Sequence, residues 1–316
     1  MSKIIATGSY LPKQMMTNKE LIEQTGIESS DEWITQRTGI KQRHFAHPDE
    51  TVSDLAVEAV NNLLVRLDKT VVRDINLIIV ASMSSKLPTP SVASQVQEAL
   101  GIKEAWSFDI SGACSGFTMA LELAEKLGRD KTSGYTLIIG AEKMSSILNF
   151  EDRGTSILFG DGAGAMLIEQ DGEGLVDYES QLVSIPDPER SICVHPDEKM
   201  TMEGRSGFSF VLRQVIPSLS HFIDTQVGTF DYLISHQANE RFINVFSKKL
   251  KVSPDKIPTN ISQVANTSAG SIPILFDQLV KQGDIPKDGS QKVVFVGYGA
   301  GLSWGQMSFK EKKKKN

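Results

Sequence analysis

Ala105-Trp-Ser-Phe-Asp-Ile110 is a short apolar run, and Gly112-Ala-Cys-Ser-Gly116 separates it from a stretch rich in Met, Ala and Leu that continues to Leu127. The first run has the composition of a buried strand, and the last has the apolar spacing of an amphipathic helix. Small residues between the two permit a sharp turn of the backbone. Residues 105–127 therefore predict a strand, a tight turn and a helix, with Cys114 in the turn.

Similar units recur along the chain, because short β-branched runs alternate with longer amphipathic stretches. This alternation is typical of a sheet covered by helices and predicts an α/β fold. The predicted strands are residues 77–81, 136–140, 164–169, 232–235 and 293–296, and the predicted helices are residues 52–67, 90–100, 115–127, 208–222, 238–250 and 271–282.

The two halves of the chain resemble each other weakly. Residues 74–81 and 230–236 both begin with an acidic turn before an apolar strand, and residues 159–168 and 296–304 both carry a glycine-rich turn beside a strand. We therefore predict two duplicated halves. The first, residues 1–170, contains the candidate cysteine, and the second, residues 171–316, contains the candidate histidine and asparagine described below.

Composition argues against several classes of protein. With 316 residues, 40% of them hydrophobic, the chain is long enough for two domains. A net charge of −6 argues against a general nucleic-acid binder, and no apolar run approaches the roughly 20 residues that cross a bilayer. The two cysteines, Cys114 and Cys193, lie too far apart in the sequence for a cluster of closely spaced metal ligands. We expect a cytoplasmic protein that binds no metal and contacts neither membrane nor nucleic acid.

Cys114 is the candidate nucleophile. At the start of a helix, the helix dipole lowers the pKa of a thiol, and free backbone N–H groups can stabilise an oxyanion. In the later loop Gly297-Tyr-Gly-Ala-Gly301, a backbone N–H near Ala300 is the candidate second donor. A small buried cysteine at a tight packing site would give the same local pattern. The residues around Cys114 alone leave these two interpretations equally open.

Two polar residues of the second half are candidate partners. His236 follows the predicted strand Tyr232-Leu-Ile-Ser235, and Asn266 follows Ala265 in a turn of small residues. Both lie at the ends of elements, where active-site groups collect in parallel sheets. A histidine that only caps a strand is the alternative interpretation for His236.

Seven short motifs are distributed over the chain: Asp31-Glu-Trp-Ile-Thr-Gln-Arg-Thr-Gly-Ile40, Ala113-Cys-Ser-Gly-Phe117, Asp152-Arg-Gly-Thr155, Phe159-Gly-Asp-Gly-Ala-Gly164, His236-Gln-Ala-Asn239, Asn266-Thr-Ser-Ala269 and Leu302-Ser-Trp-Gly305. In combination and in spacing they resemble the type III β-ketoacyl-carrier-protein synthases of the thiolase superfamily. The resemblance covers the chain almost end to end. It implies a duplicated five-layered αβαβα thiolase-like fold and a homodimer.

The resemblance also implies a reaction and its residues. Cys114 would accept the acyl group of a short acyl-coenzyme A, and His236 and Asn266 would support the decarboxylation of malonyl-acyl carrier protein. The products would be 3-oxoacyl-carrier protein, coenzyme A and carbon dioxide, in the step that initiates fatty acid biosynthesis. Coenzyme A enters as part of the thioester substrate, and no cofactor is expected.

The remaining site residues are implied in the same way. Coenzyme A contacts are expected from Trp33, Arg37, Arg153 and Asn239, and carrier-protein contacts from Gln237, Ala238, Asn239, Glu240, Arg241, Lys248 and Lys249. The expected walls of the acyl pocket are Leu87, Met144, Phe159, Met202 and Tyr298. Leu87 would close the pocket of the partner subunit, where several relatives have phenylalanine. We therefore expect room for primers of roughly four to five carbons beside acetyl, with about 0.8 kcal/mol for each buried methylene.

Three departures from the family pattern and three alternatives bear on this interpretation. Ser111-Gly112 replaces the more usual apolar pair before Ala-Cys. Ala265 and Ala300 stand where the family usually has glycine, which matters if either backbone needs a positive φ. A papain-like protease would need a different cysteine signature, and an α/β-hydrolase would need an acid before a late histidine. A specialised condensing enzyme or acyltransferase of secondary metabolism, with another acyl-coenzyme A or acceptor, stays open.

Overall fold

The computed structural model of the chain describes residues 3–65, 67–128, 134–170, 175–194, 199–286 and 291–310. Two main sheets form its framework. The first has the order β1-β7-β6-β4-β5 and the second the order β11-β12-β13-β8. The first consists of β1 (Lys3–Tyr10), β4 (Ile75–Ala81), β5 (Trp106–Ile110), β6 (Tyr135–Glu142) and β7 (Gly162–Glu169), and the second of β8 (Val176–Ser184), β11 (Tyr232–Ser235), β12 (Lys292–Gly299) and β13 (Ser303–Lys310).

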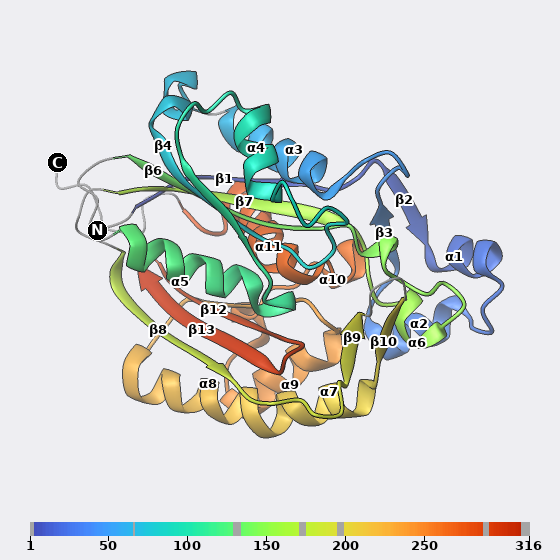
Figure 1. Ribbon diagram of the computed structural model, residues 1–316. Coiled ribbons are helices and arrows are strands. Elements are labelled where there is room, and N and C mark those ends of the chain that lie inside the picture. Colours follow the sequence, from blue (N-terminus) through green and yellow to red (C-terminus); the bar gives the residue numbers. More distant parts are fainter. Residues whose placement is uncertain are drawn as a thin grey trace.

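Helices cover both sheets and fill the space between them (Figure 1). The layers hold α3 (Val52–Leu64) and α4 (Val92–Ala99) outside the first sheet, α5 (Gly116–Gly128) and α11 (Ser271–Gln282) between the sheets, and α7 (Gly204–Phe210), α8 (Ile216–Phe222) and α9 (Glu240–Leu250) outside the second. Helices and sheets thus alternate in five layers. The predicted α/β class and the duplicated αβαβα thiolase-like arrangement are confirmed.

Smaller elements surround the end of the sheets at which the chain turns from β5 into α5. They are the antiparallel pairs β2 (Gln14–Thr17) with β3 (Gln42–Phe45) and β9 (Ile192–Val194) with β10 (Met200–Met202), and the short helices α1 (Asn18–Thr25), α2 (Asp31–Thr38), α6 (Arg153–Ser156) and α10 (Ile261–Val264). Within the described ranges, no helix has the length and apolar character required to cross a membrane.

The middle layer explains why the chain folds this way. Strands β4, β6 and β7 are buried on both faces, so their sequences are nearly continuous apolar runs rather than alternating ones. Helix α5 presents Phe117, Leu121 and Ala124 to this core. Burying one such large side chain contributes about 1.5–3 kcal/mol. On α11, the buried Asp277 accepts hydrogen bonds from the hydroxyl groups of Thr7 and Ser9 on β1.

Most predicted elements are present, with end points that agree to within two residues for all but two of the helices. The helix expected over residues 52–67 ends at Leu64. The one expected over residues 208–222 begins at Gly204 and continues through two π-helical turns to Val227. Strands β1, β8 and β13 were not predicted. Each main sheet lies within one predicted half, but α5 and α11 contact both sheets, so the division into residues 1–170 and 171–316 stays a prediction.

Ala265 lies in a backbone conformation that side chains rarely adopt. It follows α10 with φ 60° and ψ −164°, a region occupied almost only by glycine. Its methyl group is buried beside Ile40 and Ile261. Of the two departures from the family glycines, Ala265 thus has the positive φ, whereas Ala300 is not among the residues with positive φ.

This strain predicts an unusual response to Ala265→Gly. Glycine relieves about 1–3 kcal/mol of backbone strain, loses about 0.8 kcal/mol of methyl burial, and adds about 0.4–1 kcal/mol of unfolded-state entropy. The terms oppose one another and sum to between about −0.8 and +1.8 kcal/mol, so the free energy of unfolding should fall only slightly or should rise. The buried Ala165 in β7 has no positive φ, and Ala165→Gly should lower the same free energy by about 1–2 kcal/mol. Urea unfolding measures both, and equal losses would contradict the strain at Ala265.

Candidate active site

Cys114 lies in the predicted strand-to-helix turn. Strand β5 ends at Ile110, a 3-10 turn spans Ala113–Ser115, and α5 follows at once. Ala113 has φ 44°, which bends the backbone sharply. A Cβ atom on Gly112 would lie 2.6 Å from Met119 Sδ and 2.9 Å from Gly116 Cα. Glycine at 112 is therefore required by packing, and the local structure predicted around Cys114 is confirmed.

The end of β12, in the second half of the chain, lies against the Cys114 turn. A Cβ atom on Gly299 would lie 2.9 Å from Cys114 Cβ and 3.0 Å from its backbone nitrogen. Next to it, Ala300 lines the same cavity as Cys114. The Ser115 and Ser303 hydroxyl groups are hydrogen-bonded at 2.8 Å. The two backbone segments expected to form an oxyanion hole are therefore close together.

His236 directly follows β11 and is almost fully buried. Its Nδ1 lies 2.7 Å from the Ser271 hydroxyl oxygen, and its ring packs edge-on against Tyr298 at 5.2 Å between centroids. Burial lowers the pKa of His236 to about 3. The imidazole is therefore neutral at physiological pH and can donate a hydrogen bond from the ring nitrogen that carries the proton.

Asn266 is fixed by its backbone and by its side-chain oxygen. Its backbone pairs with the segment around Phe159, through the Leu158 carbonyl and the Gly160 N–H. Its Oδ1 accepts a hydrogen bond from the Ser268 N–H at 2.8 Å. With Oδ1 engaged, the Nδ2 amine is the group of this side chain that is available as a donor toward the cavity.

One cavity of about 460 Å³ brings these residues together, because Cys114, His236, Asn266 and Ala300 all line it. Four of the five expected acyl-pocket residues also line it, namely Met144, Phe159, Met202 and Tyr298. Sequence reasoning missed the other apolar walls, which are Met83, Leu158, Ile192, Met200, Phe208, Phe210, Val211 and Phe242. Leu87 does not line the cavity of its own chain, and 52% of its surface is exposed.

Three residues expected to contact coenzyme A form a cluster beside this cavity. The guanidinium carbons of Arg37 and Arg153 lie 5.4 and 4.6 Å from the ring centroid of Trp33. Asn239 caps α9, and its amide donates to the Arg37 carbonyl at 3.1 Å. Arg37 and Asn239 line the cavity, as does Arg205, a cation that the sequence analysis did not single out.

The residues expected to contact a carrier protein divide by exposure. Glu240, Arg241, Lys248 and Lys249 are exposed on α9, whereas Ala238 lines the cavity. Gln237 is buried, and its side-chain amide bonds to Ser235, Thr259 and Asn260. The Gln237 side chain thus fixes the turn before α9 rather than lying on the exposed face of that helix.

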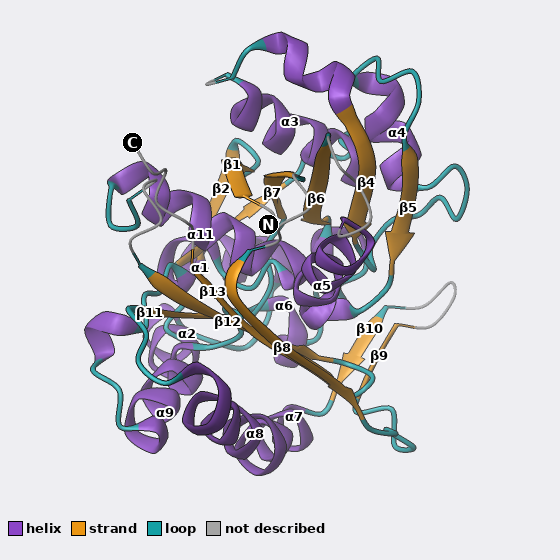
Figure 2. Cartoon of the chain, turned by 90° about the vertical axis from the view of Figure 1, so that its left-hand side faces the viewer, coloured by secondary structure: helices purple, strands orange, loops and turns teal. Residues whose placement is uncertain are grey.

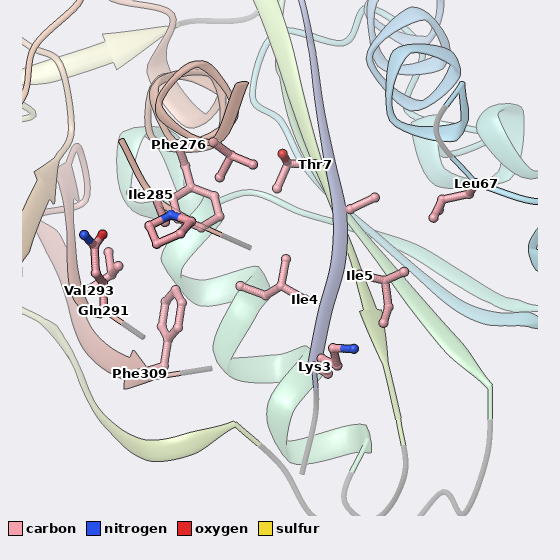
Figure 3. A pocket seen from close by; sticks show the side chains of 13 residues that line it. Lys3, Ile4, Ile5, Thr7, Leu67, Phe276, Ile285, Gln291, Val293 and Phe309 are labelled. Atoms are coloured by element: carbon pink, nitrogen blue, oxygen red, sulfur yellow. The ribbon is translucent and has the colours of Figure 1, made fainter. Parts of the chain in front are cut away.

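A second cavity, of about 250 Å³, lies near the start of β1, between that strand, α11 and β13 (Figure 3). Its walls include Ile4, Phe276, Val293 and Phe309. Lys3 at this end of β1 pairs with Glu169, the residue that also pairs with Tyr135 at the start of β6. The cavity is therefore at the opposite end of the first sheet from Cys114. Among the described residues, no group of three or more His, Cys, Asp and Glu side chains could hold a metal ion.

Known families provide an independent comparison. Residues 108–183 match the family model of 3-oxoacyl-[acyl-carrier-protein (ACP)] synthase III, and residues 223–310 match the model of its C-terminal part. A β-ketoacyl-[acyl-carrier-protein] synthase III of Streptococcus gordonii is 41% identical over 323 aligned positions, which cover 97% of this chain and 98% of that protein.

Solved structures agree with these matches. The crystal structure of 3-oxoacyl-[acyl-carrier-protein] synthase III from Aquifex aeolicus VF5 superposes with a TM-score of 0.89 and 35% identity, over 98% of this chain and 100% of that one. The crystal structure of the priming β-ketosynthase from the R1128 polyketide pathway superposes with a TM-score of 0.89 at 29% sequence identity. The superposition covers 99% of this chain and 97% of that chain. The chain therefore belongs to the β-ketoacyl-[acyl-carrier-protein] synthase III family.

Proposed function

We propose that this enzyme condenses a short acyl-coenzyme A with malonyl-acyl carrier protein and so initiates fatty acid biosynthesis. The reaction releases coenzyme A and carbon dioxide and gives a 3-oxoacyl-carrier protein. The observation that carries the proposal is the single cavity that joins Cys114 of one half to His236 and Asn266 of the other. The sequence relatives over nearly the whole chain support the same reaction.

The first half-reaction stores the acyl group on Cys114. The sulfur attacks the thioester carbonyl, coenzyme A leaves, and a new thioester forms without loss of activation. Negative charge develops on the carbonyl oxygen during this step. The backbone N–H groups of Cys114 and Ala300 are proposed as its donors, because Gly299 holds the two segments against each other.

The second half-reaction needs hydrogen-bond donors that do not protonate the product too early. Loss of carbon dioxide from the malonyl group leaves an enolate, whose charge lies on the thioester oxygen. A neutral imidazole and an amide suit this task, since both stabilise the oxygen without giving up a proton. If the Ser271 hydroxyl donates to Nδ1, His236 carries its proton on Nε2 and presents it to the enolate.

Substrate binding is proposed to use two charged areas. The flat cluster of Trp33, Arg37 and Arg153 can stack on an adenine and meet phosphate groups. The carrier protein is proposed to dock on the exposed face of α9, where Arg241, Lys248 and Lys249 attract acidic side chains. Because both proposed substrates are those of fatty acid biosynthesis, we also propose that the enzyme is cytoplasmic.

A homodimer is proposed from the edge of the first sheet. Strand β5 lies at the outer edge of the sheet (Figure 2), and Trp106 on it is 55% exposed. An unpaired apolar edge is a surface that a second copy can cover. Leu87 lies in the loop before α4, which packs beside β5. From that position it is proposed to close the acyl cavity of the partner subunit.

Acylation provides the first test of the function. Mixing the enzyme with acyl-coenzyme A esters of two to six carbons should add one acyl mass per chain, for acetyl and for primers of four to five carbons, by intact-mass measurement. Cys114→Ala should carry no adduct, whereas Cys193→Ala should be acylated normally. Leu87→Phe should narrow the range toward acetyl. An adduct on Cys114→Ala would assign the nucleophile elsewhere, and a panel that acylates only with unusual esters would favour the secondary-metabolism alternative.

The two half-reactions should respond differently to loss of the donors. His236→Ala and Asn266→Ala should each slow condensation with malonyl-carrier protein by about 10²–10³, the usual effect of removing one such donor. Acylation of Cys114 should change much less, because the enolate does not occur in that step. Single-turnover assays of each half-reaction measure both rates. Equal losses in the two steps for His236→Ala would indicate that the imidazole acts on the thiol instead.

Charge on α9 should control use of the carrier protein alone. Lys248→Glu and Lys249→Glu should raise the KM for malonyl-carrier protein, and added salt should raise it in the unmodified enzyme. The KM for acetyl-coenzyme A should stay nearly constant. Lys19→Glu, on helix α1 rather than on α9, serves as a control for net charge. If neither added salt nor charge reversal changes the KM for malonyl-carrier protein, α9 is excluded as the docking face.

A further inference from the structure

Glu142 is a fully buried carboxyl group at the end of β6, and the reaction described above does not use it. Both oxygens accept hydrogen bonds, and the Met83 N–H lies 3.3 Å from Oε1 and 3.1 Å from Oε2. Oε1 accepts a hydrogen bond from the Ser268 hydroxyl at 3.0 Å. Oε2 accepts from groups at the end of β4, namely the hydroxyl groups of Ser82 and Ser84 and the backbone N–H groups of Met83 and Ser84. Among the described residues it has no ion-pair partner.

Ser268 connects this carboxyl group to the nucleophile. The Cys114 thiol donates to the Ser268 hydroxyl, with Sγ and Oγ 3.5 Å apart, and the same hydroxyl donates to Glu142. Ser268 has a positive φ of 49°, and its backbone N–H donates a hydrogen bond to Asn266 Oδ1, which holds it in place. Thiol, hydroxyl and carboxylate thus form a continuous chain in which every proton points toward Glu142.

The other titratable groups near this chain are engaged elsewhere. His236 Nδ1 is bound to Ser271, and the Tyr298 hydroxyl donates to the His236 carbonyl. The ammonium of Lys143 binds the carbonyl oxygens of residues 47, 48 and 50, and Asp161 binds the N–H of Ala46 and both the N–H and hydroxyl of Ser145. Besides burial, the negative charge of Glu142 raises the pKa of the neighbouring Cys114 thiol and so opposes its ionisation.

We propose that Glu142 accepts the Cys114 proton through Ser268 as the sulfur attacks the acyl thioester. The S–H bond of Cys114 breaks, its proton binds Ser268 Oγ, and the original Ser268 proton moves to Glu142 Oε1. Meanwhile the new S–C bond forms, and coenzyme A leaves as a thiolate that takes a proton from water. When condensation later expels Cys114 as a thiolate, the chain returns the stored proton. Cys114 and Glu142 together carry at most one negative charge at any stage, so two negative charges are never buried side by side.

The acid–base properties of the two ends agree with this direction. Burial raises the pKa of Glu142 to about 7, against the lowering effect of its hydrogen bonds from Ser84, Met83, Ser268 and Ser82. A base is most effective when its pKa lies near the working pH. Burial also raises the pKa of Cys114 to about 12, contrary to the lowering expected from the helix start, although the hydrogen bond to Ser268 lowers it. A free thiolate is therefore scarce, and attack coupled to proton removal is the faster route.

The pH dependence of acylation tests the relay. Only ionised Glu142 accepts a proton, so the acylation rate of the unmodified enzyme should rise with pH through about 7 and then level off. Glu142→Gln should acylate about 10²–10⁴ times more slowly at neutral pH, the usual contribution of a positioned base. Its rate should keep rising with pH, because free thiolate is then the remaining nucleophile. Ser268→Ala interrupts the chain and should behave in the same way.

Ser84→Ala is the matched variant, and it decides the question if Glu142→Gln does not fold. It removes the hydrogen bond that lowers the pKa of Glu142 most, but leaves the chain from Cys114 intact. The rising part of its profile should move to higher pH, with a plateau rate within a few-fold of normal. A merely structural Glu142 would move neither profile, and unchanged profiles in Glu142→Gln or in Ser84→Ala would overturn the relay.

The relay rests on the proposed acylation of Cys114, and the two can fail separately. If the unmodified enzyme forms no adduct with any acyl-coenzyme A, the proposed function is wrong. If it forms the adduct but Glu142→Gln acylates at the normal rate with the normal pH profile, the relay alone is wrong.

Discussion

The two sheets share one middle layer, and this constraint determines the rest of the molecule. Helices α5 and α11 are buried between both sheets, so each must present apolar side chains on opposite faces. Interiors of this kind are packed to crystal-like density and leave little freedom to shift a helix along its axis. The N-terminal ends of both helices are therefore fixed at the same edge of the sheets. Cys114 lies in the turn just before α5 and Asn266 in the segment that leads into α11, which is why distant parts of the sequence meet in one cavity.

Close backbone contact at that edge has a conformational cost. Ala113, Ala265 and Ser268 all have positive φ, and Gly112 and Gly299 have no room for a side chain. Such conformations cost of order 1–3 kcal/mol each and persist when the surroundings over-determine them. Here the surroundings are the buried layers described above. The strained backbone places Cys114 and Asn266 on the wall of one cavity and the Ser268 hydroxyl between Cys114 and Glu142.

Local patterns predicted the parts of the fold that depend on local physics. The strand, turn and helix around Cys114 and the position of His236 after β11 follow from apolar periodicity and small residues. Strands β8 and β13 were missed, since they carry many polar residues and are recognisable only by their pairing. Glu142 was missed for a different reason. A carboxyl group after an apolar strand is usually solvated, and only the tertiary structure buries it beneath Ser268. The cavity walls from α7 likewise needed the long helix to be placed in space.

If the proposed dimer forms, Leu87 would make the acyl cavity depend on protein concentration. More than half of this side chain is exposed, and it does not touch the cavity of its own chain. In the proposed dimer, each subunit completes the acyl cavity of the other. The fraction of complete cavities would then equal the fraction of chains in the dimer, which depends on protein concentration. Dilution below the dissociation constant of that proposed dimer would remove one wall from every cavity, and the primers selected would then differ between dilute and concentrated enzyme.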